Sequence, residues 1–255
     1  MDLGLTGARA LVCGGSAGLG AAVAAELVAE GARVAIAARP GPHLDERAQR
    51  LPAVAVPVDL ATETGPRTAV ASAVEALGGL DCLLVNSGGP PLGRFGDLTE
   101  AEWQRAIDGT LWSALRLVRE ALPHLGAGRA PAIAVILSSS VRMPVDGITT
   151  SNVLRPGLAG LVKSLAAEIA PIRINGIAPG RIATERVAQL DAATAARTGR
   201  SVEEVRAAVV AQIPLGRYGE PAEVGRLAAF LLSPAASYLT GIIVPIDGGM
   251  IRSLP

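Results

Sequence analysis

The order of apolar segments along this chain restricts its fold more than any other feature. Runs of Val, Ile, Leu and Ala with the length of a β-strand alternate with longer segments of helical period. This alternation predicts a doubly wound α/β fold, with a parallel sheet and helices on both of its faces. Seven strands are predicted, at residues 8–13, 33–38, 53–58, 80–86, 132–137, 173–177 and 242–246. Helices are predicted at residues 18–30, 64–77, 100–122, 150–170 and 221–232.

Nothing in the sequence indicates a domain boundary. The 255 residues contain no linker, repeat or low-complexity tract, so we interpret residues 1–255 as one domain. Residues 184–213 depart from the general pattern, because they are polar and charged and have little strand character. They follow a predicted strand, and we expect them to form a partly helical lid over a ligand crevice.

Charge and cysteine content argue against several functions. The 23 basic and 23 acidic residues cancel, which argues against a nucleic-acid-binding face. Cys13 and Cys82 lie far apart in apolar segments without metal-ligand spacing, so we expect reduced thiols, no metal site and a cytoplasmic protein. Asp2 stands where a secretion signal would be basic, and glycines and a charge interrupt the apolar stretch 8–29. We therefore expect neither a secretion signal nor a membrane span.

A glycine-rich turn follows the first predicted strand and reads Cys13-Gly14-Gly15-Ser16-Ala17-Gly18-Leu19-Gly20. Glycines let such a turn adopt positive φ and approach a pyrophosphate, and the next helix offers free N–H groups to the anion. Glycine clusters also build ordinary turns, but a position between the first strand and the first helix favours dinucleotide binding. We assign to the cofactor Gly14, Ser16, Ala17, Gly18, Leu19 and Gly20.

The spacing Gly14-x-x-x-Gly18-x-Gly20 resembles that of the short-chain dehydrogenase/reductase family, and the resemblance extends over nearly the whole chain. Further matching elements are Asp59-Leu60 at the adenine position, Asn86-Ser87-Gly88 after the fourth strand, Pro179-Gly180 with Ile182 and Thr184 beside the nicotinamide, and the closing segment 238–249. The resemblance implies a Rossmann-type fold, a nicotinamide cofactor bound by these residues, and a homotetramer or homodimer.

The end of the second predicted strand bears on the choice of cofactor. An NAD-preferring site has an acid there that accepts hydrogen bonds from the ribose. This chain has Ala38 followed by Arg39, and a guanidinium suits the 2′-phosphate of NADP. The alternative is a solvated Arg in a loop. We favour NADP(H) over NAD(H).

The family's proton chemistry normally uses a Tyr whose pKa is lowered by a Lys four residues later, but this pair is missing here. The tyrosines are Tyr218 and Tyr238 and the lysine is Lys163, so no Tyr-x-x-x-Lys occurs. An aliphatic hydroxyl is far too weak an acid to replace the phenol, whose general acid catalysis is worth about 100- to 10,000-fold.

Matching the local sequence to the family assigns the four catalytic positions. Ser138 takes the Ser position, Ser151 the Tyr position, Arg155 the Lys position and Thr110 the position of an Asn. Arg155 can hydrogen-bond the nicotinamide ribose and stabilise negative charge, but it cannot usefully donate a proton.

Two functions of different classes remain open. The first is a reductase for a small molecule with a conjugated C=C bond or an activated carbonyl, in which Ser138, Ser151 and Arg155 form an oxyanion-type donor cluster. Solvent or Asp146 would then supply the proton. The second is a catalytically silent dinucleotide-binding relative with a regulatory or scaffolding role. The serines that follow the fifth strand and the polar lid favour the reductase.

Overall fold

The computed structural model describes residues 2–253 and confirms the predicted sheet. Within these residues, seven parallel strands are arranged in the order β3-β2-β1-β4-β5-β6-β7. Each predicted strand is present to within two residues at either end: β1 Arg9–Cys13, β2 Arg33–Ala38, β3 Val54–Pro57, β4 Cys82–Val85, β5 Ala132–Ile136, β6 Arg173–Pro179 and β7 Ile243–Ile246.

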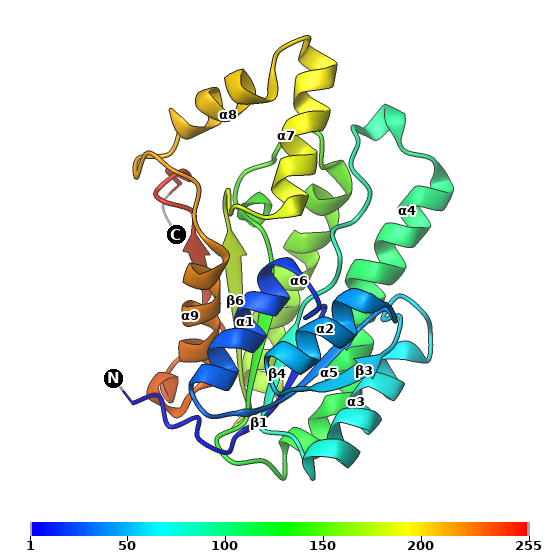
Figure 1. The fold of residues 1–255 in the computed structure, drawn as a ribbon, viewed down its shortest axis with the longest axis vertical. Helices are drawn as coiled ribbons and strands as arrows, with labels where there is room; N and C mark the ends of the chain where they lie inside the picture. The colour runs from blue at the N-terminus through cyan, green and yellow to red at the C-terminus, as the bar shows by residue number, and fades with distance from the viewer. Residues whose placement is uncertain (1, 254–255) are drawn as a thin grey trace.

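Helices cover both faces of the sheet (Figure 1). On one face, the apolar core includes residues of α1 (Gly18–Ala29), α2 (Pro42–Arg50) and α9 (Pro221–Leu232). On the other face it includes residues of α3 (Gly65–Leu77), α5 (Ser113–Leu125) and α6 (Thr149–Glu168). Alternate residues of the strands enter the two cores, which explains why the strands are mostly apolar.

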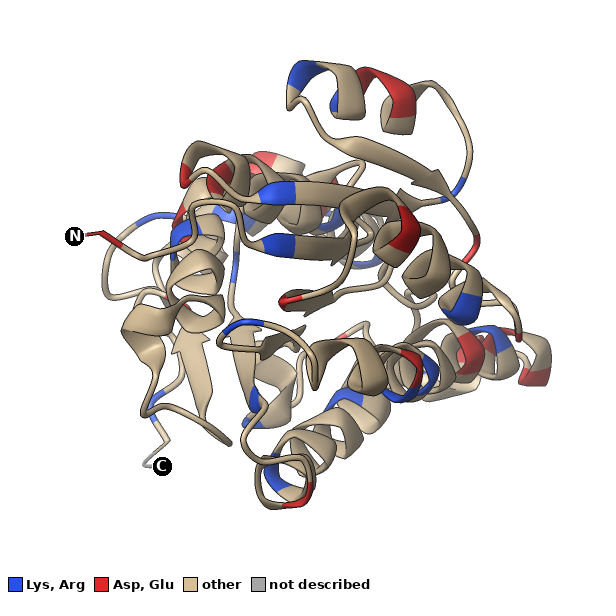
Figure 2. Ribbon diagram, turned by 90° about the horizontal axis from the view of Figure 1, so that it is seen from below, with Lys and Arg blue, Asp and Glu red and all other residues tan. Residues whose placement is uncertain are grey.

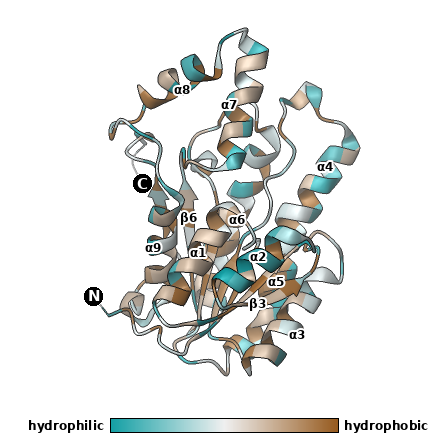
Figure 3. Ribbon diagram, in the orientation of Figure 1, coloured by the Kyte–Doolittle hydropathy of each residue, from teal (hydrophilic) through white to brown (hydrophobic). Residues whose placement is uncertain are grey.

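Two helical segments differ from the prediction. The predicted helix 100–122 is divided into α4 (Glu100–Ala106), a π-helical segment (Ile107–Trp112) and α5. Helix α2 was not predicted, because only Leu44 and Ala48 of its residues are buried and the rest of it is strongly hydrophilic (Figure 3).

The polar stretch after β6 folds into α7 (Glu185–Thr198) and α8 (Val202–Val210), which project beyond the carboxyl ends of the strands (Figure 1). Acidic and basic residues are interspersed over the molecule rather than separated onto opposite faces (Figure 2). Among the described residues, no helix combines the length and apolar character that a membrane span requires.

Candidate active site and cofactor crevice

The glycine-rich turn lies where the strand order reverses. Strands β1 and β4 are direct neighbours at the centre of the sheet, and open α/β sheets bind ligands at such a switch point. Asn86 follows β4, and its Nδ2 donates to the main-chain oxygens of Cys13 at 3.2 Å and Gly14 at 3.3 Å. This amide therefore holds the glycine turn against the end of β4.

The geometry of the turn suits a pyrophosphate. Gly14 and Gly18 have φ values of 60° and 54°, which few other residues adopt. A Cβ on Gly20 would lie 2.2 Å from the carbonyl oxygen of Gly14, so the turn packs on α1 only because Gly20 has no side chain. Helix α1 begins after Ala17 with no side-chain cap and no acid in its first turn. Its first N–H groups are therefore suited to bind an anion.

The other predicted adenosine contacts lie on the same edge of the sheet. The N–H of Gly14 donates to the carbonyl of Ala37 at 2.7 Å, which brings the end of β2 and the exposed Arg39 beside the glycine turn. Asp59 lies two residues beyond β3 rather than at its end, and it is followed by the buried Leu60.

The segment after β6 connects the sheet to α7. The N–H of Gly180 donates to the carbonyl of Ile246 at 3.0 Å, so this turn is held against β7. Ile182 is buried, and Thr184 forms the N-cap of α7. The methyl carbon of Thr184 lies 4.0 Å from the position that a Cβ would take on Gly18. The start of α7 therefore lies beside the glycine turn.

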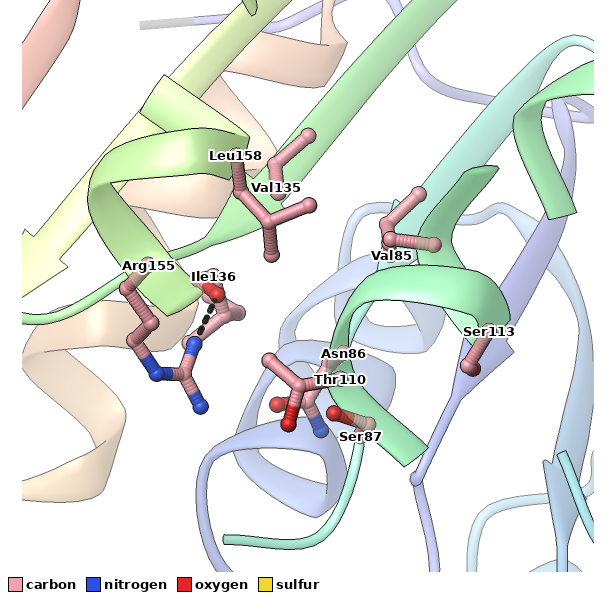
Figure 4. Close-up of a pocket in the computed structure, with 10 residues that line it drawn as sticks. Val85, Asn86, Ser87, Thr110, Ser113, Val135, Ile136, Arg155 and Leu158 are labelled. Atoms are coloured by element: carbon pink, nitrogen blue, oxygen red, sulfur yellow. Dashed lines mark hydrogen bonds between the residues drawn. The ribbon is translucent and has the colours of Figure 1, made fainter. Parts of the chain in front are cut away.

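Three of the four predicted catalytic residues lie around the end of β5. The Oγ of Ser138 accepts from the N–H of Ser140 at 3.1 Å, and the hydroxyls of Ser140 and Ser151 lie 3.4 Å apart. One turn further along α6, Arg155 donates from Nη1 to the carbonyl of Ile136 (Figure 4). Ser151 and Arg155 are only 4% and 8% exposed. The residues predicted to stand at the Tyr and Lys positions are thus a buried hydroxyl and a buried guanidinium.

Burial changes the acidity of this guanidinium. Removal from water, and after it the positive charge of Arg186, lower the pKa of Arg155 to about 10. Arg155 still carries its charge at neutral pH. It can therefore stabilise an anion but cannot serve as a proton donor there.

Thr110, the fourth predicted residue, lies in the π-helical segment on the opposite wall of a small cavity from Arg155 (Figure 4). The cavity has a volume of about 10 Å³, close to the space that one water molecule needs. The hydroxyls of Thr110 and Ser113 are buried, and neither has a hydrogen-bond partner within residues 2–253. The cavity is thus lined by polar groups that a water could satisfy.

Neither tyrosine of the chain lies beside Arg155. Tyr218 donates its hydroxyl to Asp191 at 2.9 Å, and burial followed by this hydrogen bond raises the pKa of Tyr218 to about 12. Tyr238 is fully exposed. It lies near the amino ends of the strands, since the N–H of Gly241, three residues later, donates to the carbonyl of Ile174 at the start of β6. Neither tyrosine lines the cavity beside Arg155.

The geometry argues against Asp146 as the proton source. Its carboxylate accepts two hydrogen bonds from Arg94, both at 3.0 Å, and one from Arg197 at 2.6 Å. The hydrogen bonds from Arg94, followed by the charge of Arg197, lower the pKa of Asp146. Asp146 is therefore ionised at neutral pH, and solvent remains as the predicted proton source. These ion pairs border a second cavity of about 180 Å³ between the loop at Gly93 and α7.

Sequence reasoning missed one residue that reaches the site. Arg186, in the first turn of α7, donates to the carbonyl of Pro90 in the loop after β4. A Cβ on Gly89 would lie 2.4 Å from Nε of Arg186, so the glycine makes room for this side chain. The Gly-Gly-Pro-Pro run at residues 88–91 was the only signal in the sequence that could have indicated this contact.

Comparison with known proteins agrees with the geometry. A family model described as enoyl-(acyl carrier protein) reductase matches residues 14–251. Galactitol 2-dehydrogenase (L-tagatose-forming) of Cereibacter sphaeroides is 34% identical over 256 residues, which covers 96% of this chain and 95% of the relative. The 3-oxoacyl-(acyl-carrier-protein) reductase of Aquifex aeolicus is 30% identical over 259 residues, covering 98% of this chain and 100% of the relative.

The match extends to solved structures. L-Sorbose reductase of Gluconobacter frateurii, solved with NADPH and L-sorbose, has a TM-score of 0.92 at 30% identity and covers 100% of both chains. The chain belongs to the short-chain dehydrogenase/reductase family, and it is an oxidoreductase of that type.

Proposed function

We propose that the protein is an NADP(H)-dependent reductase of a small molecule that carries a conjugated C=C bond or an activated carbonyl. Hydride is transferred to a substrate carbon, the negative charge develops on an oxygen, and solvent supplies the proton. The observation that carries the proposal is the buried cluster at the end of β5, where Ser151 and Arg155 offer donors but no acid. Such a cluster suits a substrate in which the negative charge that develops during hydride transfer is delocalised over several atoms.

The crevice has the features that a dinucleotide requires. The uncapped start of α1 would hold the pyrophosphate, and Arg39 would pair with the 2′-phosphate of NADP. Asp59, Leu60, Ser87 and Gly88 would line the adenosine and ribose, and Gly180, Ile182 and Thr184 the nicotinamide amide. When bound, the reduced cofactor supplies the hydride. The sorbose reductase solved with NADPH supports this choice of cofactor.

The chain's own residues orient the substrate and stabilise charge. The Ser140–Ser151 hydrogen bond leaves Ser151 able to turn its proton towards a substrate oxygen, because either hydroxyl can be the donor. Arg155 donates from Nη1 to the carbonyl of Ile136, and within residues 2–253 its other N–H groups have no partner, so they can bind the nicotinamide ribose or a developing oxyanion. Thr110 would hold a water in the small cavity opposite.

Calorimetric titration with NADPH and NADH, followed by turnover assays, tests the proposal. We expect micromolar binding of NADPH, weaker binding of NADH, and NADPH oxidation with an enone, an enoyl thioester or a reactive diketone. Arg155→Ala should abolish turnover while the protein still binds NADPH. Tight NADPH binding without oxidation of any of these acceptors would instead identify a catalytically silent relative.

We further infer that α7 and α8 act as a lid and that the protein forms a homotetramer or homodimer in the cytoplasm. The contacts of α7 with Pro90 and Asp146 support the lid, because they cross the crevice from a separate segment. Sedimentation would test the assembly, and a monomeric mass would overturn it.

A further inference from the structure

Two arginines from different helices donate to carbonyls near the carboxyl ends of β4 and β5. Arg155 projects from α6 and donates to Ile136, the last residue of β5. Arg186 projects from α7 and donates to Pro90 in the loop that follows β4. The positive charge of Arg186 acts on Arg155 and, after burial, lowers its pKa. Both side chains are thus anchored through neutral carbonyls rather than through acids.

This pair differs from three other arginines of neighbouring segments. Arg94 and Arg197 share Asp146, and Arg181 pairs with Asp191. Within residues 2–253, no carboxylate forms an ion pair with Arg155 or Arg186. Burial lowers the pKa of both guanidinium groups. Two like charges that are largely removed from water and have no counter-ion favour an anionic ligand.

The loop beside the pair is shaped to admit Arg186. The Nε of Arg186 would lie 2.4 Å from a Cβ on Gly89, so a side chain there would have to displace Arg186. The next residue, Pro90, is buried and supplies the accepting carbonyl. Gly89 therefore determines how deeply Arg186 enters the site, independently of any cofactor contact.

We propose that Arg155 and Arg186 form an anion site and that the substrate of the reductase carries a carboxylate that binds there. The proposal rests on the proposed reductase function and specifies its substrate class. The phosphates of the cofactor have other partners, the start of α1 and Arg39, at the ends of β1 and β2. The arginine pair lies over β4 and β5 instead, beside the serine cluster.

The test compares carboxylates with their uncharged esters on the protein saturated with NADP⁺, which cannot reduce them. The probes are crotonate and 2-oxobutanoate, each beside its methyl ester, titrated by calorimetry. We expect at least one carboxylate to bind about 10- to 100-fold more tightly than its ester, the value of a charge-assisted hydrogen bond. Equal binding of the acid and the ester in both pairs would overturn the proposal.

Three variants assign the effect to the pair. Arg186→Gln removes one charge, and Gly89→Ala retains Arg186 but displaces it; both should abolish the preference for the carboxylate. Arg200→Gln is the matched control, because Arg200 lies between α7 and α8, is exposed, and its guanidinium donates to the carbonyl of Glu204. This control should retain the full preference.

Titration with NADP⁺ alone separates the two possible anions. We expect its affinity to change less than twofold in Arg186→Gln. A loss equal to that of the carboxylate would assign the pair to the cofactor phosphates and refute the proposal. If no dinucleotide binds to the wild-type protein, the reductase function fails, and the acid–ester comparison on the cofactor-free protein still decides whether the anion site exists.

Discussion

Replacing Gly20 with Ala should weaken cofactor binding through a steric effect that can be estimated from the structure. The new Cβ would lie 2.2 Å from the carbonyl oxygen of Gly14 and 2.9 Å from Nδ2 of Asn86. Ordinary contact begins at 3.4 Å, so the turn must move by 1.2 Å, the difference between 3.4 Å and 2.2 Å. That movement breaks the Asn86 hydrogen bonds at 3.2 and 3.3 Å.

Overpacking of this kind costs about 1–3 kcal/mol. If the whole cost falls on the cofactor complex, the dissociation constant for NADPH rises by about 5- to 150-fold. Fluorescence titration with NADPH measures the dissociation constant, and thermal unfolding shows whether the fold is retained. Gly96→Ala is the control, since a Cβ on Gly96 meets nothing within 4 Å. Wild-type affinity in a folded Gly20→Ala protein would refute the assignment of this turn to the pyrophosphate.

Three further substitutions test other parts of the structure. Arg39→Ala should weaken NADPH binding by about tenfold and leave NADH unchanged, as compared by calorimetry, because only NADPH has a 2′-phosphate. Asp81→Asn should lower the free energy of unfolding in urea by about 2 kcal/mol near neutral pH. Burial raises the pKa of Asp81, but hydrogen bonds, chiefly from Arg9, lower it to about 2. A carboxyl with a lowered pKa stabilises the fold above its unfolded pKa, so the wild type should lose this advantage as the pH falls from about 4 towards 2. Tyr218→Phe should cost about 1 kcal/mol by removing the hydrogen bond to Asp191, yet change turnover less than twofold. A 100-fold loss of turnover would make Tyr218 the missing acid.

The sheet could be predicted from sequence because its strands are buried on both faces. In β1, Leu11 and Cys13 enter one core and Ala10 and Val12 the other, so after Arg9 the strand has no polar residue that would obscure the pattern. Helix α2 has the opposite character, with two buried residues in a hydrophilic segment. The π-helical segment 107–112 has no distinct apolar period, so the sequence indicated one continuous helix instead.

The site could be predicted only where its residues lie in recognisable local motifs. The glycine turn, Asn86 and the serines after β5 all lie directly after strands, which places them at one edge of the sheet. Arg186 was missed because it meets Pro90 across 96 positions of the chain. The ion pairs of Asp146 were missed for the same reason, and they change its role from a possible acid to a fixed anion.

The proposed anion site accounts together for the absence of a tyrosine at residue 151 and of a lysine at residue 155. In the family the lysine lowers the pKa of the tyrosine, and that role has no purpose when the phenol is absent. A guanidinium remains charged with a pKa of about 10, so Arg155 keeps a permanent positive charge where a lysine amine could lose its proton. A permanent buried charge is costly unless an anion accompanies it. Arg186 adds a second charge nearby, so under the proposed carboxylate site the replacement that removes the phenol and the amine also supplies the charge that selects a negatively charged substrate.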